Sequence, residues 1–178
     1  MSSYITTSSK IHFTPVSPDP EQIVIRDIAH ALSLMTRANG HFPEFYSVGQ
    51  HSIACAREAI ARNYSSRVVL ACLLHDGSEA YLSDITRPVK GELSEYRRIE
   101  KNMQDAIYVR FLGQIPSDEE MSQIADIDNA CLYYEFDHYM GEKLMEQAPL
   151  LVTDPAFETL PFAQVEQEFL DLFATLTV

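Results

Sequence analysis

The stretch SSRVVLACLLHD, residues 65–76, decides what kind of fold this chain can form. Seven consecutive apolar residues, Val68–Leu74, lead directly into a histidine and an aspartate. Ser65, or the serine after it, can cap the start of a helix, and a helix that is apolar all round is buried inside a protein. We therefore expect a buried helix that runs to about Leu82 and carries a cluster of ionisable groups near its end.

Helical periodicity continues on both sides of this stretch. Apolar residues recur at the three- and four-residue spacing of one helical face, and segments with glycine or proline separate the periodic runs. Further helices are predicted at about 25–37, 47–63, 93–113, 116–142 and 162–176. The prediction is an all-α fold, formed by a single domain over residues 1–178.

The N-terminal part and one internal segment depart from the helical pattern. KIHFTPV and QIVIRDI carry β-branched and aromatic residues, and SPDPE, residues 17–21, lies between them. These segments predict a short N-terminal β-hairpin. TRPVKGE, residues 86–92, contains proline and glycine and predicts a break between helices.

The charge of the chain limits its partners. Thirteen basic residues against 26 acidic ones leave a formal net charge of -13, and such a field repels a nucleic-acid backbone. We therefore expect no nucleic-acid polymer as a partner. A site for a small anion must be built from a few placed cations or a metal ion.

The cysteines and the hydropathy favour a cytoplasmic protein. Cys55, Cys72 and Cys131 are odd in number, far apart and surrounded by apolar residues. This is more typical of reduced core thiols than of a disulfide or a cysteine-metal site. No stretch approaches the roughly 18 apolar residues of a membrane helix, and MSSYITTSSK has no apolar signal core. No membrane association is expected.

The helical pattern also separates inward-facing ionisable residues from solvated ones, because positions three and four apart share a face. His51 has apolar neighbours on its face, and Asp128 lies in the middle of an apolar stripe. Asp126 has mostly polar neighbours and should face water. His75 and Asp76 emerge from the end of the most apolar helix.

These inward-facing residues have the composition of a metal site. Two imidazoles and two carboxylates from three helices suit one divalent transition metal, with positions left open for water or substrate. The predicted ligands are His51, His75, Asp76 and Asp128. Each has a structural alternative, because a lone buried histidine is more often a hydrogen-bonded core residue and a buried aspartate can be satisfied by amides or an arginine.

The same residues resemble a known family. The order His, then His-Asp, then a distant Asp is similar to that of the HD-domain metal-dependent phosphohydrolases. The string HDGSEAYLSDITRPVK, residues 75–90, resembles the small bacterial and phage branch that contains 5'-deoxynucleotidases and deoxynucleoside triphosphate hydrolases. The similarity extends from DIAHALSL through YSVGQHS to DNACLYYE.

The resemblance implies a compact helical bundle with one divalent metal ion, which could be Mn, Co, Fe, Ni, Zn or Mg. It also assigns roles around that ion. Glu79 matches a carboxylate that acts as acid or base or positions water, and Asp84 matches a second essential carboxylate. Arg37 matches an arginine that grips the phosphate, and Lys90 lies in a similar supporting position.

The activity implied by the resemblance is hydrolysis of deoxynucleoside 5'-monophosphates to nucleoside and phosphate by a metal-activated water. The alternatives are a triphosphohydrolase that releases triphosphate, a non-catalytic nucleotide sensor and a purely structural helical protein. Ala38 stands where mononucleotide-specific members carry a tryptophan. The family also implies a homo-oligomer, and the aromatic residues between Tyr133 and Tyr139 fit either an interface or the core. Phe42 could stack on a base or pack in the core.

Overall fold

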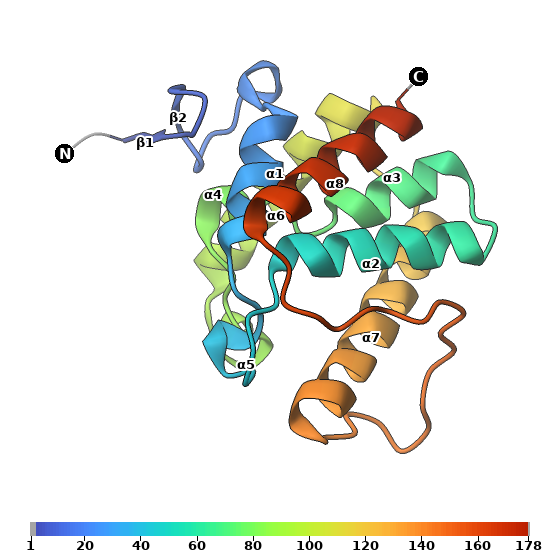
Figure 1. The fold of residues 1–178 in the computed structure, drawn as a ribbon. Coiled ribbons are helices and arrows are strands. Elements are labelled where there is room, and N and C mark those ends of the chain that lie inside the picture. Colours follow the sequence, from blue (N-terminus) through green and yellow to red (C-terminus); the bar gives the residue numbers. More distant parts are fainter. Residues whose placement is uncertain (1–2, 178) are drawn as a thin grey trace.

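The apolar run at residues 68–74 forms most of helix α3, Ser66–Leu74, and every residue of the run is buried. The computed structural model describes residues 3–177. Helix α3 packs against four others, and Figure 1 shows it behind α2 in the body of the molecule. The other α-helices are α1 (Ile25–Leu34), α2 (Val48–Ala61), α4 (Glu79–Leu82), α5 (Arg87–Glu92), α6 (Ser94–Leu112), α7 (Asp118–Met140) and α8 (Phe162–Leu176).

The all-α prediction is therefore confirmed, and several predicted helix ends are confirmed by their caps. The Ser47 side chain accepts from the Gln50 amide in a capping box, and Ser65 caps α3 through the Val68 amide. Each cap satisfies an amide that the first turn of a helix leaves without a partner. Helix α6 ends at Gly113, which adopts the left-handed conformation that glycine tolerates best.

Helix α3 is shorter than predicted, because the chain turns at residues 75–78 before it continues as α4. Gly77 explains where the turn occurs. A Cβ atom at this position would lie 2.9 Å from the Leu74 carbonyl oxygen and 3.1 Å from Cδ1 of Ile107 on α6. The glycine therefore allows the end of α3 to approach α6 closely, and it leaves the following residues turned toward a cavity.

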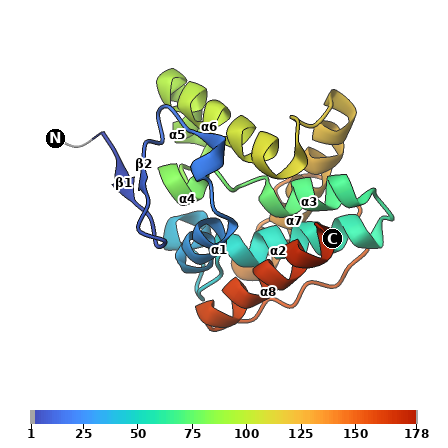
Figure 2. The same cartoon turned by 90° about the horizontal axis from the view of Figure 1, so that it is seen from above.

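The N-terminal hairpin exists, and one of its strands lies in the predicted segment KIHFTPV, but its partner is not the predicted QIVIRDI. Strand β1 (Ile5–Thr6) pairs antiparallel with β2 (His12–Phe13), and QIVIRDI instead leads into α1. Asp27 on α1 accepts hydrogen bonds from Ser8 Oγ and the Ser9 amide, which ties the hairpin to the helix. The helical spacing of apolar residues in α1 therefore determines its structure, although its first residues favour a strand. Figure 2 shows the hairpin at one end of the molecule.

Two further expectations need correction. The segment TRPVKGE is not a simple break, since it contains the whole of α5 with a proline in its first turn, where proline is tolerated. The first predicted helix ends at Leu34, and residues Arg37–Gly40 form a separate short 3-10 helix, η2. A second one, η1, covers Pro20–Gln22.

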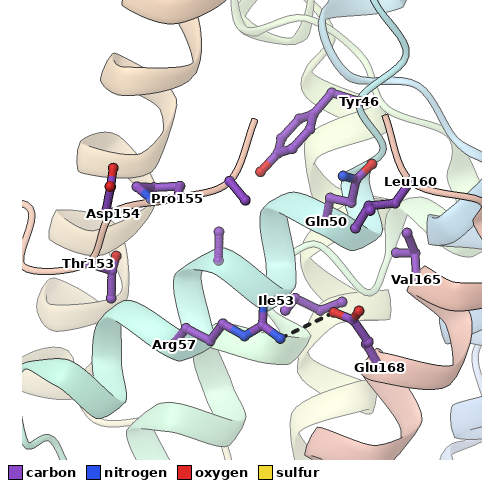
Figure 3. Close-up of a pocket in the computed structure, with 12 residues that line it drawn as sticks. Tyr46, Gln50, Ile53, Arg57, Thr153, Asp154, Pro155, Leu160, Val165 and Glu168 are labelled. Atoms are coloured by element: carbon purple, nitrogen blue, oxygen red, sulfur yellow. Dashed lines mark hydrogen bonds and ion pairs between the residues drawn. The ribbon is translucent and has the colours of Figure 1, made fainter. Parts of the chain in front are cut away.

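A long segment without helix or strand, residues 141–161, connects α7 to α8, and we call it the strap. Figure 1 shows it crossing beneath α2. The buried carboxylate of Glu58 on α2 holds it, accepting from the amides of Val152 (2.9 and 3.1 Å) and Thr153 (2.9 Å). A cavity of about 360 Å³ lies between the strap, α2 and α8, with Tyr46, Gln50 and Leu160 in its wall (Figure 3).

The aromatic residues near the end of α7 belong to the interior of this chain. Tyr139 stacks on Phe42, with 4.7 Å between ring centroids, and packs against Tyr46. Tyr133 is also buried. Of the two fates expected for these rings, the structure therefore supports core packing for Tyr133 and Tyr139. Within residues 3–177, no helix has both the length and the apolar character required to cross a lipid bilayer.

Candidate metal centre

Two histidine rings face each other at the centre of the candidate site. His51 lies on α2 and is 0% exposed, and His75 follows directly after the last residue of α3. Their Nε2 atoms are 3.2 Å apart. The packing of α2 on α3 brings the two rings together, although 24 residues separate them in the sequence.

The other nitrogen of each ring is already engaged. His75 Nδ1 lies 2.8 Å from the Cys72 carbonyl oxygen, which can only accept, so Nδ1 carries a hydrogen. His51 Nδ1 lies 2.5 Å from Oε1 of Glu135 on α7. Burial raises the pKa of Glu135, but His51 and Arg37 outweigh burial and lower it, so Glu135 is an acceptor. In the neutral rings, both Nε2 atoms therefore present lone pairs to each other.

Two carboxylates lie close to the facing Nε2 atoms of the histidines. Asp128 Oδ1 lies 3.2 Å from His51 Nε2 and 3.7 Å from His75 Nε2. Asp76 places Oδ1 at 3.3 Å from His75 Nε2 and Oδ2 at 3.8 Å from His51 Nε2. All four residues predicted as ligands are therefore adjacent in the structure.

Acceptors that converge in this way need a positive charge between them. Ligand atoms that each lie about 2.1 Å from one ion are separated by about 3.0–3.4 Å, close to several of the distances here. Oδ2 of Asp76 is buried and accepts no hydrogen bond within the described residues. These side chains therefore fit a metal ion, both in chemistry and in spacing.

Protons take the place of that charge when no ion is bound. Burial and the nearby Arg37 lower the pKa of His51, but Glu135 and Asp128 outweigh both and raise it to about 10. Burial raises the pKa of Asp128, but hydrogen bonds from His51 and His75 lower it far below its usual range. The site thus has a strong preference for bound positive charge.

A cysteine completes the group of possible ligand atoms. Cys55 Sγ lies 3.5 Å from His51 Nε2, and one ligand atom each from His51, Cys55 and His75 lie within 4.8 Å of one another. These residues could hold a metal ion. All three cysteines are unpaired and buried, as expected for reduced thiols, but Cys55 is not an ordinary core residue.

A cavity of about 550 Å³ opens beside the histidines and carboxylates, and it is lined by most of the other predicted site residues. Its walls include Arg37, Asp76, Glu79, Asp84, Lys90 and Asp128, together with Phe42, Leu132 and Phe136. Burial, Asp76 and Asp84 raise the pKa of Glu79 to about 9. Glu79 therefore holds a proton at neutral pH, and its buried Oε2 has no hydrogen-bond partner among the described residues.

The cations around this cavity are mostly paired. Arg37 Nη1 lies 3.5 Å from Oδ2 of Asp76, and Lys90 Nζ lies 2.6 Å from Oε1 of Glu100. Arg87 extends from α5 to the outer oxygen of Asp128, Oδ2, at 2.8 Å. A phosphate entering this cavity would meet guanidinium and ammonium groups that carboxylates already hold in place.

Two bacterial proteins are similar to this chain in sequence. YfdR of Escherichia coli K12, an uncharacterized protein, is 36% identical over 109 residues, which cover 61% of this chain and 58% of YfdR. RCAP_rcc00048 of Rhodobacter capsulatus, also an uncharacterized protein, is 36% identical over 102 residues, covering 54% of this chain and 52% of that protein. The chain spans about half the length of these curated relatives. No family model matches the sequence.

Glu135 is a site residue that was not predicted, although the sequence carries a signal for it. Glu135 follows Asp128 by seven residues, which is two helical turns, so both lie on the same face of α7. Its Oε1 is bonded to His51, and its Oε2 accepts from Nε and Nη2 of Arg37 at 3.3 and 3.2 Å. Glu135 thus joins the predicted metal ligands to the predicted phosphate-binding arginine.

The predicted inward and outward faces of α7 are confirmed by the burial of its residues. Asp128 lies partly buried among the histidines, whereas Asp126 is exposed to solvent. Cys55 carried a comparable signal, because it follows His51 by one helical turn. Its apolar neighbours instead favoured a reduced core thiol.

Proposed function

We propose that this chain is a metal-dependent phosphohydrolase that acts on deoxynucleoside 5'-monophosphates and releases nucleoside and phosphate. The observation that carries the proposal is the convergence of four acceptor side chains, His51, His75, Asp76 and Asp128, at separations of 3.2–3.8 Å. Asp76 and Asp128 border a cavity that also presents the carboxyl groups of Glu79 and Asp84 and an arginine. The resemblance of the motifs to HD-domain phosphohydrolases supports the same activity.

The proposed ligands would hold one divalent ion. A bound ion of this kind supplies Lewis acidity to a phosphate oxygen and lowers the pKa of water. Asp128 is oriented by Arg87, and His51 is oriented by Glu135, so two of the ligands are held by charged partners. Such outer contacts fix ring orientation and raise ligand basicity.

Other residues of the cavity would act on the substrate directly. Arg37 supplies guanidinium N–H groups that can donate to a phosphate oxygen. Glu79 can orient the attacking water or deliver a proton to the leaving nucleoside oxygen. Asp84 lies on the same cavity wall, where it can accept from water or from a sugar hydroxyl. Lys90 adds positive charge at the edge of the site.

The same cavity has room and surface for a nucleoside. Phe42 and Phe136 meet edge to face, with 5.3 Å between ring centroids, and Leu132 lies on the same wall. Aromatic and aliphatic surface of this kind can pack against a base. A volume of about 550 Å³ is within the range of about 300–1,000 Å³ typical of small-molecule sites.

The test is product release by metal-stripped protein to which Mn, Co, Ni, Zn or Mg is restored singly. Deoxy- and ribonucleoside mono- and triphosphates are offered, and free phosphate and triphosphate are measured. We expect phosphate from deoxynucleoside monophosphates with at least one metal. Triphosphate release would replace the proposal with a triphosphohydrolase, and tight metal binding without any turnover would favour a nucleotide sensor.

A further inference from the structure

Cys55 lies on the side of His51 where an ion would bind. It is 1% exposed, and its Sγ lies 3.5 Å from His51 Nε2. The opposite ring nitrogen, Nδ1, is occupied by Glu135. The thiol therefore contacts the same nitrogen that faces His75 and Asp128.

The spacing of the sulfur is that of a metal ligand. A thiolate sulfur lies about 2.3 Å from zinc and an imidazole nitrogen about 2.0–2.1 Å, so the two are about 3.1–3.6 Å apart for ligand angles of about 90–110°. The observed distance is 3.5 Å. A helix rise of one turn between His51 and Cys55 places both side chains on one face of α2, so no rearrangement of the backbone is needed.

The position of Cys55 distinguishes it from the other cysteines. Cys72 on α3 is also fully buried, but it contributes its backbone carbonyl to His75 and its side chain is not part of the ligand group. Cys131 lies one turn after Asp128 on α7 and is buried. Of the three thiols, Cys55 alone belongs to the group that could hold an ion within residues 3–177.

We propose that Cys55 is a ligand of the ion bound by His51 and His75, so that the centre takes a thiophilic ion such as Zn²⁺, Co²⁺ or Fe²⁺ in preference to Mg²⁺. This inference rests on the proposed function for the presence of an ion. On binding, the thiol proton leaves to solvent and a sulfur-metal bond forms, without any change of oxidation state. Sulfur ligands select zinc and related ions over magnesium, which prefers oxygen.

The test is Co²⁺ substitution of the metal-stripped full chain, followed by absorption spectroscopy. Sulfur bound to Co²⁺ gives a near-ultraviolet charge-transfer band that nitrogen and oxygen ligands do not give. We expect this band in the wild type, its loss in Cys55→Ala and its retention in Cys72→Ala. The two variants are matched, because both remove a buried thiol from a helix, and circular dichroism confirms that each is folded.

X-ray absorption of the Zn²⁺-loaded wild type provides a second measurement that needs no variant. We expect a sulfur shell at about 2.3 Å. We also expect Cys55→Ala to lower Zn²⁺ affinity by at least the roughly tenfold that loss of an outer-shell partner costs, with Mg²⁺ affinity unchanged.

The outcomes separate this inference from the proposed function. Stoichiometric Co²⁺ binding without the sulfur band overturns the role of Cys55 and leaves the proposed activity standing. X-ray absorption of the Zn²⁺-loaded protein that shows only nitrogen and oxygen ligands has the same consequence. A band that persists in Cys55→Ala also overturns it, because another thiol would then be the ligand. No bound ion at all overturns both this inference and the metal-dependent activity.

Discussion

Glu135 is a buried residue that contacts both the candidate metal centre and Arg37. Its two carboxylate oxygens hold His51 on one side and Arg37 on the other, and the residue is 1% exposed. One proposed metal ligand, His51, and the cation proposed to bind phosphate are therefore positioned by the same side chain. A defect at Glu135 should affect both.

We predict that Glu135→Gln weakens metal binding by about 10–100-fold, the usual cost of losing an outer-shell partner. The amide has nearly the same shape but lacks the charge that orients His51 and Arg37. Isothermal titration of the metal-stripped protein with Zn²⁺ measures the change. Asp137→Asn, two residues further along α7, is the control and should bind normally. Equal affinity of both variants would contradict the role of Glu135.

Two aspartates on α7, Asp126 and Asp128, should differ in their effect on metal affinity. Asp128→Ala should reduce metal affinity by more than about 100-fold, which exceeds the loss expected for an outer partner. Asp126→Ala should leave it unchanged, because Asp126 is exposed. Equilibrium dialysis with Co²⁺ or Zn²⁺ gives both values. A damaging Asp126→Ala together with a silent Asp128→Ala would show that the site is elsewhere.

At the scale of elements, the turn after α3 is shaped by a close contact. Gly77→Ala would place a methyl group 2.9 Å from the Leu74 carbonyl oxygen, so either the turn or α6 must shift. We predict a loss of about 1–3 kcal/mol in the free energy of unfolding, the usual cost of overpacking. Gly91→Ala in α5 is the control, since nothing lies within 4 Å of the added atom. Urea denaturation compares the two, and equal stabilities would refute the contact argument.

The strap and α2 are coupled through a carboxylate whose stabilising effect depends on pH. Burial raises the pKa of Glu58, but hydrogen bonds from Thr153, Val152 and Arg62 outweigh burial and lower it below its ordinary value of 4.5. A lowered pKa in the folded chain means that the stabilisation is present above 4.5 and is lost as pH falls through the folded value.

We therefore predict that Glu58→Gln costs about 1–3 kcal/mol of unfolding free energy at neutral pH, since it weakens the bonds to the strap. The difference from wild type should shrink as the pH is lowered well below 4.5, where the wild-type carboxylate is protonated. Denaturant titrations over this pH range measure both. Glu168→Gln removes an ion pair with the exposed Arg57, keeps an oxygen that can accept from Gln164, and is the control. If the difference in unfolding free energy between Glu58→Gln and the wild type were the same at all pH values, the ionised Glu58 carboxylate would not be what holds the strap.

At the scale of the whole molecule, metal binding should stabilise the fold, because the proposed ligands come from three parts of the chain: α2, the end of α3 and α7. An ion at a hundred times its dissociation constant adds about 2.7 kcal/mol. For a chain of this size, the melting temperature shifts by about 2–4 °C per kcal/mol. We expect Zn²⁺ to raise the melting temperature of the wild type and of Asp126→Ala but not of Asp128→Ala. An identical shift in all three would indicate binding elsewhere.

Residues close in the chain set most of the helix ends and the face on which a side chain lies. The caps at Ser47 and Ser65, the end of α6 at Gly113 and the bounds of α8 depend on residues close in the chain. The inward face of Asp128 follows from helical spacing for the same reason. The partner of strand β2 could not be assigned in this way, because Asp27 on α1 holds Ser8 and Ser9, between the two strands, through contacts that are distant in sequence.

The packing of the helices determines which residues that are distant in sequence come into contact. His51 and Asp128 are 77 residues apart in sequence and 3.2 Å apart in space, and only the packing of α2, α3 and α7 sets that distance. The same packing places Cys55 beside the ion-facing nitrogen of His51 and Glu135 behind the ring. Helical periodicity specifies the face on which a side chain lies, but helix packing determines what that face touches.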